Sequence, residues 1–306
     1  MADRELPAAP DGGNGMPLHI PSHAAPITAT TRLLAVLGDP IAHSRSPAMH
    51  NAALRALGLD WVYVALHVSP AHLPAALRGL VAMGFVGANV TIPHKERTAE
   101  LADDLTPAAR AIGAVNTLTV QGERLLGDNT DAGGLLMALA EAGVTVAERQ
   151  AVVLGAGGAA RAAAYALAQA GAQVTLANRS PARAEALAEA LQPQVRGRLE
   201  ALPLADVAAL QARLETAALL VNATSVGMEP RPTESPLPAS TRLPAGLAVL
   251  DLVYAPRQTT LLTRAAKAGC RTIGGLRVLI HQGALALEGW TGRAAPLDVM
   301  AQAVEV

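Results

Sequence analysis

The stretch AVVLGAGGAAR, residues 151–161, decides the fold of this chain. Its apolar start is typical of a buried strand, and Gly155, Gly157 and Ala160 then take the small-residue positions of the G-x-G-x-x-G/A fingerprint. A helix is expected from Arg161. Such a turn lets the backbone approach a pyrophosphate, whose charge meets the helix N-terminus. The stretch therefore predicts a dinucleotide-binding strand, turn and helix, with a tight turn in an Ala- and Gly-rich protein as the alternative.

The end of the next predicted strand, 174–180, bears on the choice of dinucleotide. It finishes with Asn178, Arg179 and Ser180, and Arg183 follows within one helical turn. An acidic residue here would bond the ribose 2′-hydroxyl of NAD, whereas the planar guanidinium of Arg suits a 2′-phosphate. Since no Asp or Glu is present, the sequence favours NADP. The alternative is that both arginines are solvated surface cations.

Strands and helices are predicted to alternate on both sides of the fingerprint. Strands are expected at 33–38, 61–66, 87–92, 151–154, 174–180 and within 218–228 and 248–254, and helices at 47–57, 71–83, 132–142, 181–191, 276–290 and from 296 onward. Strand, helix and strand at this spacing predict parallel sheets with crossover helices. We therefore predict an α/β fold with two domains, each built on a mainly parallel sheet.

The chain divides into three predicted parts. Residues 1–31 are rich in Pro, Gly and Ala without an apolar period, so they are predicted to form a flexible tail. Residues 32–131, joined by 276–306, are assigned to the first domain, and 132–275 to the Rossmann-type second domain. Five prolines within 229–246 predict a surface loop there.

Composition and charge exclude several classes of protein. The chain has 306 residues, 51% of them hydrophobic, which is enough for about two buried cores. A net charge of −1 leaves no basic stripe, so no nucleic-acid partner is expected. The sequence contains no uninterrupted apolar run of about twenty residues, so no membrane span is predicted. A single Cys, Cys270, and a start without a signal-peptide pattern favour the cytoplasm.

Polar residues follow two strands of the predicted first domain. Ser44 and Ser46 come after a strand and turn and precede Pro47, where either can cap a helix or bind a small hydroxylated or carboxylated ligand. Asn89 and Thr91 alternate at the end of the strand 87–92, so both are expected to face the crevice at its carboxyl end. A buried hydrogen-bonding pair is the structural alternative.

Lys95 follows these residues and is one of only two lysines among 24 cationic residues. A lysine beside a strand end can take part in proton transfer or hold a developing oxyanion, best with a carboxylate partner. Asp128 and Asp131 are the candidate partners, although Asp131 could instead cap a helix. The eight histidines lack metal-ligand spacing, so no metal site is predicted.

Nine motifs in order between residues 38 and 283 are similar to those of the shikimate dehydrogenase family. They are HSRSPAMHN, GANVTIPHK, GAVNT, GDNTDAGG, GAGGAAR, NRS, VNATSVGM, DLVY and GGLRVLIHQG. The resemblance covers nearly all of the chain after the predicted tail. It implies an enzyme of aromatic amino acid biosynthesis that reversibly reduces 3-dehydroshikimate to shikimate with NADPH.

The resemblance also implies a role for each matching residue. Lys95 and Asp131 would be the catalytic pair, in a substrate-binding catalytic domain of 32–131 with 276–306. The substrate would be bound by Ser44, Ser46, Asn89, Thr91, Lys95, Asn116, Asp131 and Gln282, with Tyr254 nearby. NADP would contact Gly155, Ala156, Gly157, Gly158 and Ala159 at the pyrophosphate, Asn178, Arg179, Ser180 and Arg183 at the adenosine phosphate, and Met228, Leu252 and Gly275 near the nicotinamide.

The chain departs from the family pattern in a few places. Arg277 and Val278 stand where Gly and Met are usual beside the nicotinamide, Ser180 stands where Thr is common, and the 31-residue start is additional. Arg277 either alters that site or points to solvent. The sequence leaves the oligomeric state open, a homodimer included.

Three other functions compete with the leading one. The first is a relative that oxidises quinate, with NAD or NADP, against which Arg179 and Arg183 speak. The second is a catalytically silent binder of pathway metabolites, which would need a damaged Lys/Asp pair. The third, on fold analogy alone, is a folate-type dehydrogenase, which the serine pair and the NVTIPHK motif disfavour.

Overall fold

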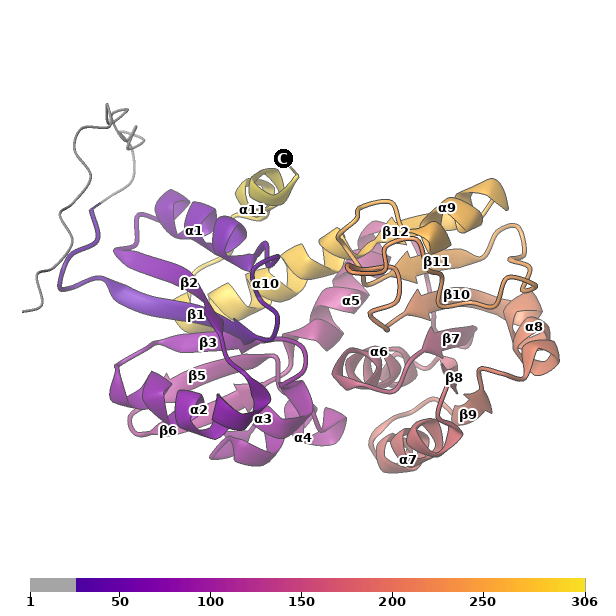
Figure 1. Ribbon diagram of the computed structural model, residues 1–306, viewed down its shortest axis with the longest axis horizontal. Helices are drawn as coiled ribbons and strands as arrows, with labels where there is room; N and C mark the ends of the chain where they lie inside the picture. The colour runs from indigo at the N-terminus through magenta and orange to yellow at the C-terminus, as the bar shows by residue number, and fades with distance from the viewer. Residues whose placement is uncertain (1–25, 306) are drawn as a thin grey trace, which may run out of the picture.

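The computed structural model describes residues 26–305 and contains two six-stranded sheets. Figure 1 shows the two sheets side by side, with long helices running between them. Residues 1–25 of the predicted tail lie outside the described part. At the end of the predicted tail, the hydroxyls of Thr30 and Thr31 donate to the carboxylate of Asp60. Within residues 26–305, no helix is long and apolar enough to cross a bilayer.

The first sheet has the strand order β2-β1-β3-β5-β6-β4. Its strands are β1 (Arg32–Gly38), β2 (Trp61–His67), β3 (Gly87–Val90), β4 (Asp104–Leu105), β5 (Thr117–Gln121) and β6 (Arg124–Asp128). The pairs β1–β2, β1–β3 and β4–β6 are parallel, whereas β5 runs antiparallel to both β3 and β6. The sheet is therefore mixed, and one edge collects the carboxyl ends of β1, β3 and β6 with the amino end of β5.

Helices cover both faces of the first sheet. They are α1 (Ser46–Ala56), α2 (Leu73–Ala82), α3 (Lys95–Leu101), α4 (Pro107–Ile112), α10 (Gly275–Thr291) and α11 (Leu297–Val304). In β1, Leu34 and Val36 pack toward α1, α10 and α11, whereas Ala35 and Leu37 pack toward α2. Since successive side chains of a strand point to opposite faces, this nearly continuous apolar strand is buried from both sides.

The second sheet is entirely parallel, with the strand order β12-β11-β10-β7-β8-β9. Its strands are β7 (Gln150–Leu154), β8 (Gln173–Asn178), β9 (Leu199–Pro203), β10 (Ala217–Asn222), β11 (Ala248–Asp251) and β12 (Arg271–Gly274). Numbered from β7, this is the 3-2-1-4-5-6 order of a Rossmann sheet, in which ligands bind where the order reverses. That switch point lies between β7 and β10.

The remaining helices belong to the second sheet or lie between the two sheets. They are α5 (Thr130–Glu141), α6 (Gly158–Gln169), α7 (Pro181–Leu191), α8 (Val207–Thr216) and α9 (Thr260–Lys267). Helices α5 and α6 share one apolar cluster with the second sheet, and α8 and α9 cover its other face. Helix α10 packs along α5, and Figure 1 shows the pair crossing between the sheets.

The predicted α/β fold with two sheets is confirmed, and several element boundaries were wrong. The strand expected at 87–92 ends at Val90, because Pro93 has no N–H to continue a ladder and the chain turns back at His94, whose N–H donates to the carbonyl of Thr91. The fingerprint helix begins at Gly158 rather than Arg161. Strands β5 and β6 were not predicted.

His50 is fully buried in the core of the first sheet. Its ring stacks on Tyr63 with centroids 4.3 Å apart, and neither ring nitrogen has a hydrogen-bond partner among residues 26–305. Burial without a partner disfavours the imidazolium and lowers the pKa of His50 from 6.5 to about 3. Between these values the unfolded chain binds a proton that the folded protein does not, so stability falls as the pH drops below 6.5.

We predict that His50→Phe, which keeps a stacking ring, removes this pH dependence. From pH 7 to pH 5 the wild-type protein should lose about 2 kcal/mol more unfolding free energy than the variant. Urea denaturation at the two pH values measures the difference. His72→Phe makes the same change at an exposed ring and should behave as wild type. An equal loss in wild type and His50→Phe would show that His50 is protonated in the folded protein.

Candidate active site

A lysine and an aspartate meet at the carboxyl edge of the first sheet. Lys95 begins α3 and Asp131 lies in the first turn of α5, and Lys95 Nζ donates to Asp131 Oδ2 at 2.6 Å. Their side chains are 15% and 18% exposed, so the ion pair is shielded yet reachable. Asn129, not Asp131, caps α5 by accepting from the backbone N–H of Ala132. The carboxylate of Asp131 is therefore available to Lys95.

Asn116 connects this pair to α10. Its Nδ2 lies 2.9 Å from Asp131 Oδ1 and 3.0 Å from Gln282 Oε1, and it also contacts Thr130. Its Oδ1 accepts from the backbone N–H of Thr130 at 2.7 Å. The amide of Asn116 thus holds the second carboxylate oxygen of Asp131 and fixes the side chain of Gln282 at the same place.

The two serines stand at the start of α1, opposite this network. Arg45 is the N-cap residue of α1 and its side chain makes no capping hydrogen bond, so neither serine stands at the N-cap position. Ser44 Oγ instead accepts from the backbone N–H of Ser46 at 3.3 Å. Tyr254 lies beside the backbone of Arg45, between the two serines, and burial raises the pKa of Tyr254.

The glycine-rich turn lies at the switch point of the second sheet. Gly155 follows β7 with φ +114°, a conformation that favours glycine, and a Cβ there would lie 3.2 Å from the carbonyl oxygen of Ala223. A Cβ on Gly158 would lie 3.0 Å from Lys95 Cβ. A Cβ on Gly157 would meet nothing closer than 3.9 Å, so its backbone faces open space. The turn and the lysine are thus direct neighbours.

The arginines expected at the adenosine end are in different environments. Arg183 Nη2 lies 3.7 Å from Glu96 Oε1, an exposed ion pair between α7 and α3. Arg179 and Ser180 are exposed beyond the end of β8, and neither lines the cavity formed by residues 26–305. Asn178, whose Nδ2 donates to the carbonyl of Ser180, does line it.

One cavity of about 600 Å³, which we call the cleft, joins the two halves of the site. The predicted residues that line it are Ser44, Ser46, Asn89, Thr91, Lys95, Asn116, Asp131, Gly155, Ala156, Gly157, Gly158, Ala159, Asn178, Arg183, Met228, Leu252, Tyr254, Gly275 and Gln282. Donor-rich backbone at the start of α6 fits a pyrophosphate, and an open Gly157 leaves it room. The residues present therefore fit a dinucleotide beside a polar ligand.

Arg277 points away from the cleft. It forms an ion pair with Glu141 near the end of α5, and its Nε lies 2.9 Å from Glu141 Oε2. His281, one turn further along α10, contacts the same carboxylate at 2.9 Å. These hydrogen bonds, that from Arg277 above all, lower the pKa of Glu141. Arg277, which departs from the family pattern, is thus accommodated by an ion pair between α10 and α5.

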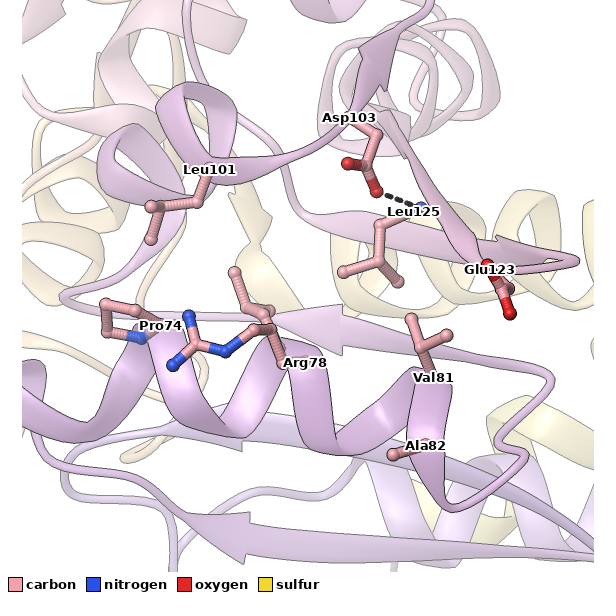
Figure 2. Close-up of a pocket in the computed structure, with 9 residues that line it drawn as sticks. Pro74, Arg78, Val81, Ala82, Leu101, Asp103, Glu123 and Leu125 are labelled. Atoms are coloured by element: carbon pink, nitrogen blue, oxygen red, sulfur yellow. Dashed lines mark hydrogen bonds between the residues drawn. The ribbon is translucent and has the colours of Figure 1, made fainter.

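A second cavity, of about 500 Å³, lies on the far side of the first sheet. Figure 2 shows Leu101 and Leu125 facing Pro74 and Arg78 on α2 across it. The carboxylate of Asp103 is engaged by the backbone N–H of Leu125 at 2.7 Å. None of the predicted site residues lines this cavity, so it is not the candidate active site.

Sequence reasoning missed three polar residues that support the site from behind the cleft, as well as His43, Glu96, Thr224 and Ser225, which line it. Tyr63 donates to Asn89 Oδ1, and Thr117 and Thr130 exchange hydrogen bonds with Asn116. Thr117 and Thr130 lie inside the quoted motifs GAVNT and GDNTDAGG, which was a usable signal. Tyr63 lies in an apolar strand, and the neighbouring sequence gives no sign that its hydroxyl takes part in the site.

Fold and cleft define a two-sheet α/β protein whose Rossmann-type sheet faces a partly buried Lys/Asp pair. Family models match it in three parts: "Shikimate dehydrogenase substrate binding domain" over 36–118, "Shikimate / quinate 5-dehydrogenase" over 138–242 and "Shikimate 5'-dehydrogenase C-terminal domain" over 275–305. The chain belongs to the shikimate dehydrogenase family.

Individual relatives agree with this assignment. "Shikimate dehydrogenase (NADP(+))" of Symbiobacterium thermophilum is 50% identical over 88% of this chain and 92% of that protein. Shikimate 5-dehydrogenase from Thermus thermophilus, solved with NADP(H) and shikimate, is 44% identical with a TM-score of 0.80 over 90% of this chain and 99% of that one. The Listeria monocytogenes enzyme, solved with shikimate and NAD, is 36% identical with a TM-score of 0.84 over 91% and 98%.

Proposed function

We propose that this chain catalyses the reversible NADPH-dependent reduction of 3-dehydroshikimate to shikimate, in the cytoplasm, on the route to chorismate and the aromatic amino acids. The observation that carries the proposal is the contact between Lys95 and Asp131, 2.6 Å long and directly beside the glycine-rich turn in one cleft. The intact pair also speaks against a catalytically silent binder. The names of the most similar relatives support the same reaction.

The proposed chemistry needs one hydride and one proton. When bound, NADP accepts or supplies the hydride. The chain orients the substrate carbon and manages the proton on its oxygen. Lys95 Nζ, a donor held by Asp131 at 2.6 Å, hydrogen bonds to that oxygen, and Asn116 keeps the second oxygen of Asp131 engaged at 2.9 Å. The proton that the substrate oxygen gains or loses is therefore exchanged with the Lys95–Asp131 pair.

The other polar residues of the cleft bind the ring. Ser44, on the loop before α1, and Ser46, the first residue of α1, hold the carboxylate, and Tyr254 lies beside Arg45 between them. The ring hydroxyls of the substrate face Asn89, Thr91, Asn116 and Gln282. Four short polar side chains and two serine hydroxyls suit a compact ring that carries both a carboxylate and several hydroxyls, because each buried polar group needs a partner.

The second half of the cleft holds NADP. Backbone N–H groups from Gly155 to Ala159 would bind the pyrophosphate at the start of α6. Asn178 and Arg183 in the cleft, with exposed Arg179 and Ser180 just outside it, would surround the 2′-phosphate. Met228, Leu252 and Gly275 border the nicotinamide. A Cβ on Gly275 would lie 2.4 Å from the carbonyl oxygen of Leu252, which explains the glycine at this helix start.

The domain assignment is part of this proposal. Residues 32–131 with 276–306 form the substrate-binding catalytic domain, and 132–275 form the NADP-binding domain. Its support is that α10 and α11 share an apolar cluster with α1 and β1, whereas α5 and α6 share one with the second sheet.

Initial rates test the proposed reaction. Purified protein is assayed with shikimate and with quinate, each with NADP and with NAD, by the absorbance of the reduced cofactor. We expect shikimate with NADP to give the largest kcat/KM. A preference for quinate or for NAD would move the assignment within the family, and no rate with any pair would favour the silent binder.

Replacement of Lys95 tests its role in proton transfer. Lys95→Met should lower kcat about 10²- to 10⁴-fold, the usual contribution of a positioned acid or base, with a smaller change in the KM for shikimate. Steady-state kinetics at saturating NADP measure both. Lys267→Met changes the only other lysine, exposed at the end of α9, and should leave kcat unchanged. A wild-type kcat in Lys95→Met would remove Lys95 from the mechanism.

Replacement of the arginines tests recognition of the 2′-phosphate. Arg183→Ala and Arg179→Ala should each raise the KM for NADP about tenfold and leave the KM for NAD nearly unchanged, because only NADP carries the phosphate. Arg149→Ala, at an exposed position just before β7, is the matched control. Equal effects on both cofactors would mean that the arginine does not recognise the phosphate.

A further inference from the structure

Tyr63 lies directly behind the cleft without lining it. It sits in the middle of β2, is 1% exposed, and its hydroxyl donates to Asn89 Oδ1 at 2.7 Å. The side chain of Ser46 lies against the same phenol and acts to lower its pKa. Ser46 and Asn89 both line the cleft, and they come from α1 and β3. One buried phenol therefore contacts two cleft residues that belong to different elements.

The hydrogen bonds of Asn89 fix the orientation of its amide. Asn89 Nδ2 lies 3.1 Å from the carbonyl oxygen of Asn116 and 3.1 Å from Thr117 Oγ1. A carbonyl can only accept, so the amino group of Asn89 must face Asn116, and the amide oxygen must face Tyr63. Both N–H groups of Asn89 are then used. The cleft is left with the second lone pair of Oδ1, which is an acceptor for a ligand hydroxyl.

The phenol is held in place by contacts that do not involve its hydroxyl. Its ring stacks on His50 and lies 6.3 Å from Trp290, and Asn51 bonds both the backbone N–H and the carbonyl of Tyr63, at 2.9 and 2.8 Å. Burial raises the pKa of Tyr63 well above its usual value, so the hydroxyl remains a donor at all working pH values. Removing only the hydroxyl should therefore leave the ring where it is.

We propose that Tyr63 is a positioning residue for the substrate: its hydroxyl holds Asn89 with the amide oxygen toward the cleft and keeps Ser46 next to it. Asn89 then accepts from a ring hydroxyl while Ser46 serves the carboxylate, so one buried group sets the relative placement of two recognition points. The inference rests on the proposed function, which gives Ser46 and Asn89 their roles.

Tyr63→Phe tests this role. We expect the KM for shikimate to rise about tenfold, because buried Asn89 Oδ1 loses the donor that holds it, while only the two bonds from Nδ2 remain. The KM for NADP should change less than about twofold, and kcat should change little, because neither the turn nor Lys95 contacts Tyr63. Tyr165→Phe, the same change on α6 outside the cleft, is the matched control. Similar rises in both Michaelis constants would overturn the proposal.

A double-variant cycle separates positioning from a general loosening of the fold. If Tyr63 acts mainly through Asn89, Tyr63→Phe should raise the KM for shikimate much less in the Asn89→Ala background than in the wild type, the remainder acting through Ser46, whereas independent effects would multiply. Multiplied effects overturn the proposal, and thermal melting checks that each variant folds. The wild-type protein is assayed first: no turnover of shikimate would refute the proposed function, and turnover with a wild-type KM in Tyr63→Phe would refute this inference alone.

Discussion

The hydrogen bond between Lys95 and Asp131 constrains most of the first half of the molecule. Two opposite charges that are largely withdrawn from water cost desolvation energy unless they meet with good geometry and have further partners. Lys95 starts α3 and Asp131, 36 residues later, lies in the first turn of α5, so the contact depends on where two helices begin. Each helix follows a strand of the same sheet, and antiparallel β5 between β3 and β6 brings both strand ends to one edge. Asn116, just before β5, then completes the shell of Asp131.

The second half of the molecule approaches this pair through glycine. A side chain at Gly158 would crowd the stem of Lys95, and one at Gly113 would lie 2.7 Å from the guanidinium of Arg161, which reaches the carbonyl oxygen of Ile112 at 2.6 Å. The same small residues that let the backbone approach a pyrophosphate therefore also let the two sheets come together. The glycine-rich sequence after β7 thus provides both the tight turn and the close contact with Lys95.

The sequence predicted the parts of this arrangement that depend on local patterns. The fingerprint at Gly155 placed the nucleotide turn, and the quoted motifs held most of the residues that line the cleft. What could not be predicted depends on register between distant segments. The antiparallel course of β5 follows from its pairing with β3 and β6, and the polar role of Tyr63 follows from β2 lying beside β1. Arg179 shows the opposite case, in which a motif position lies outside the cleft in the folded chain.

Helix α10 explains why the departure at Arg277 is compatible with the site. Gly275, Val278 and Gln282 are spaced three and four residues apart, so they lie on one face and line both halves of the cleft. Arg277 and His281 are four residues apart and lie on another face. Both hydrogen bond to Glu141 of α5, the helix that also carries Asp131. A cation at 277 therefore acts on the seam between α5 and α10. It leaves the cleft face unchanged, while the rigid helix keeps the nicotinamide border and Gln282 at a fixed separation.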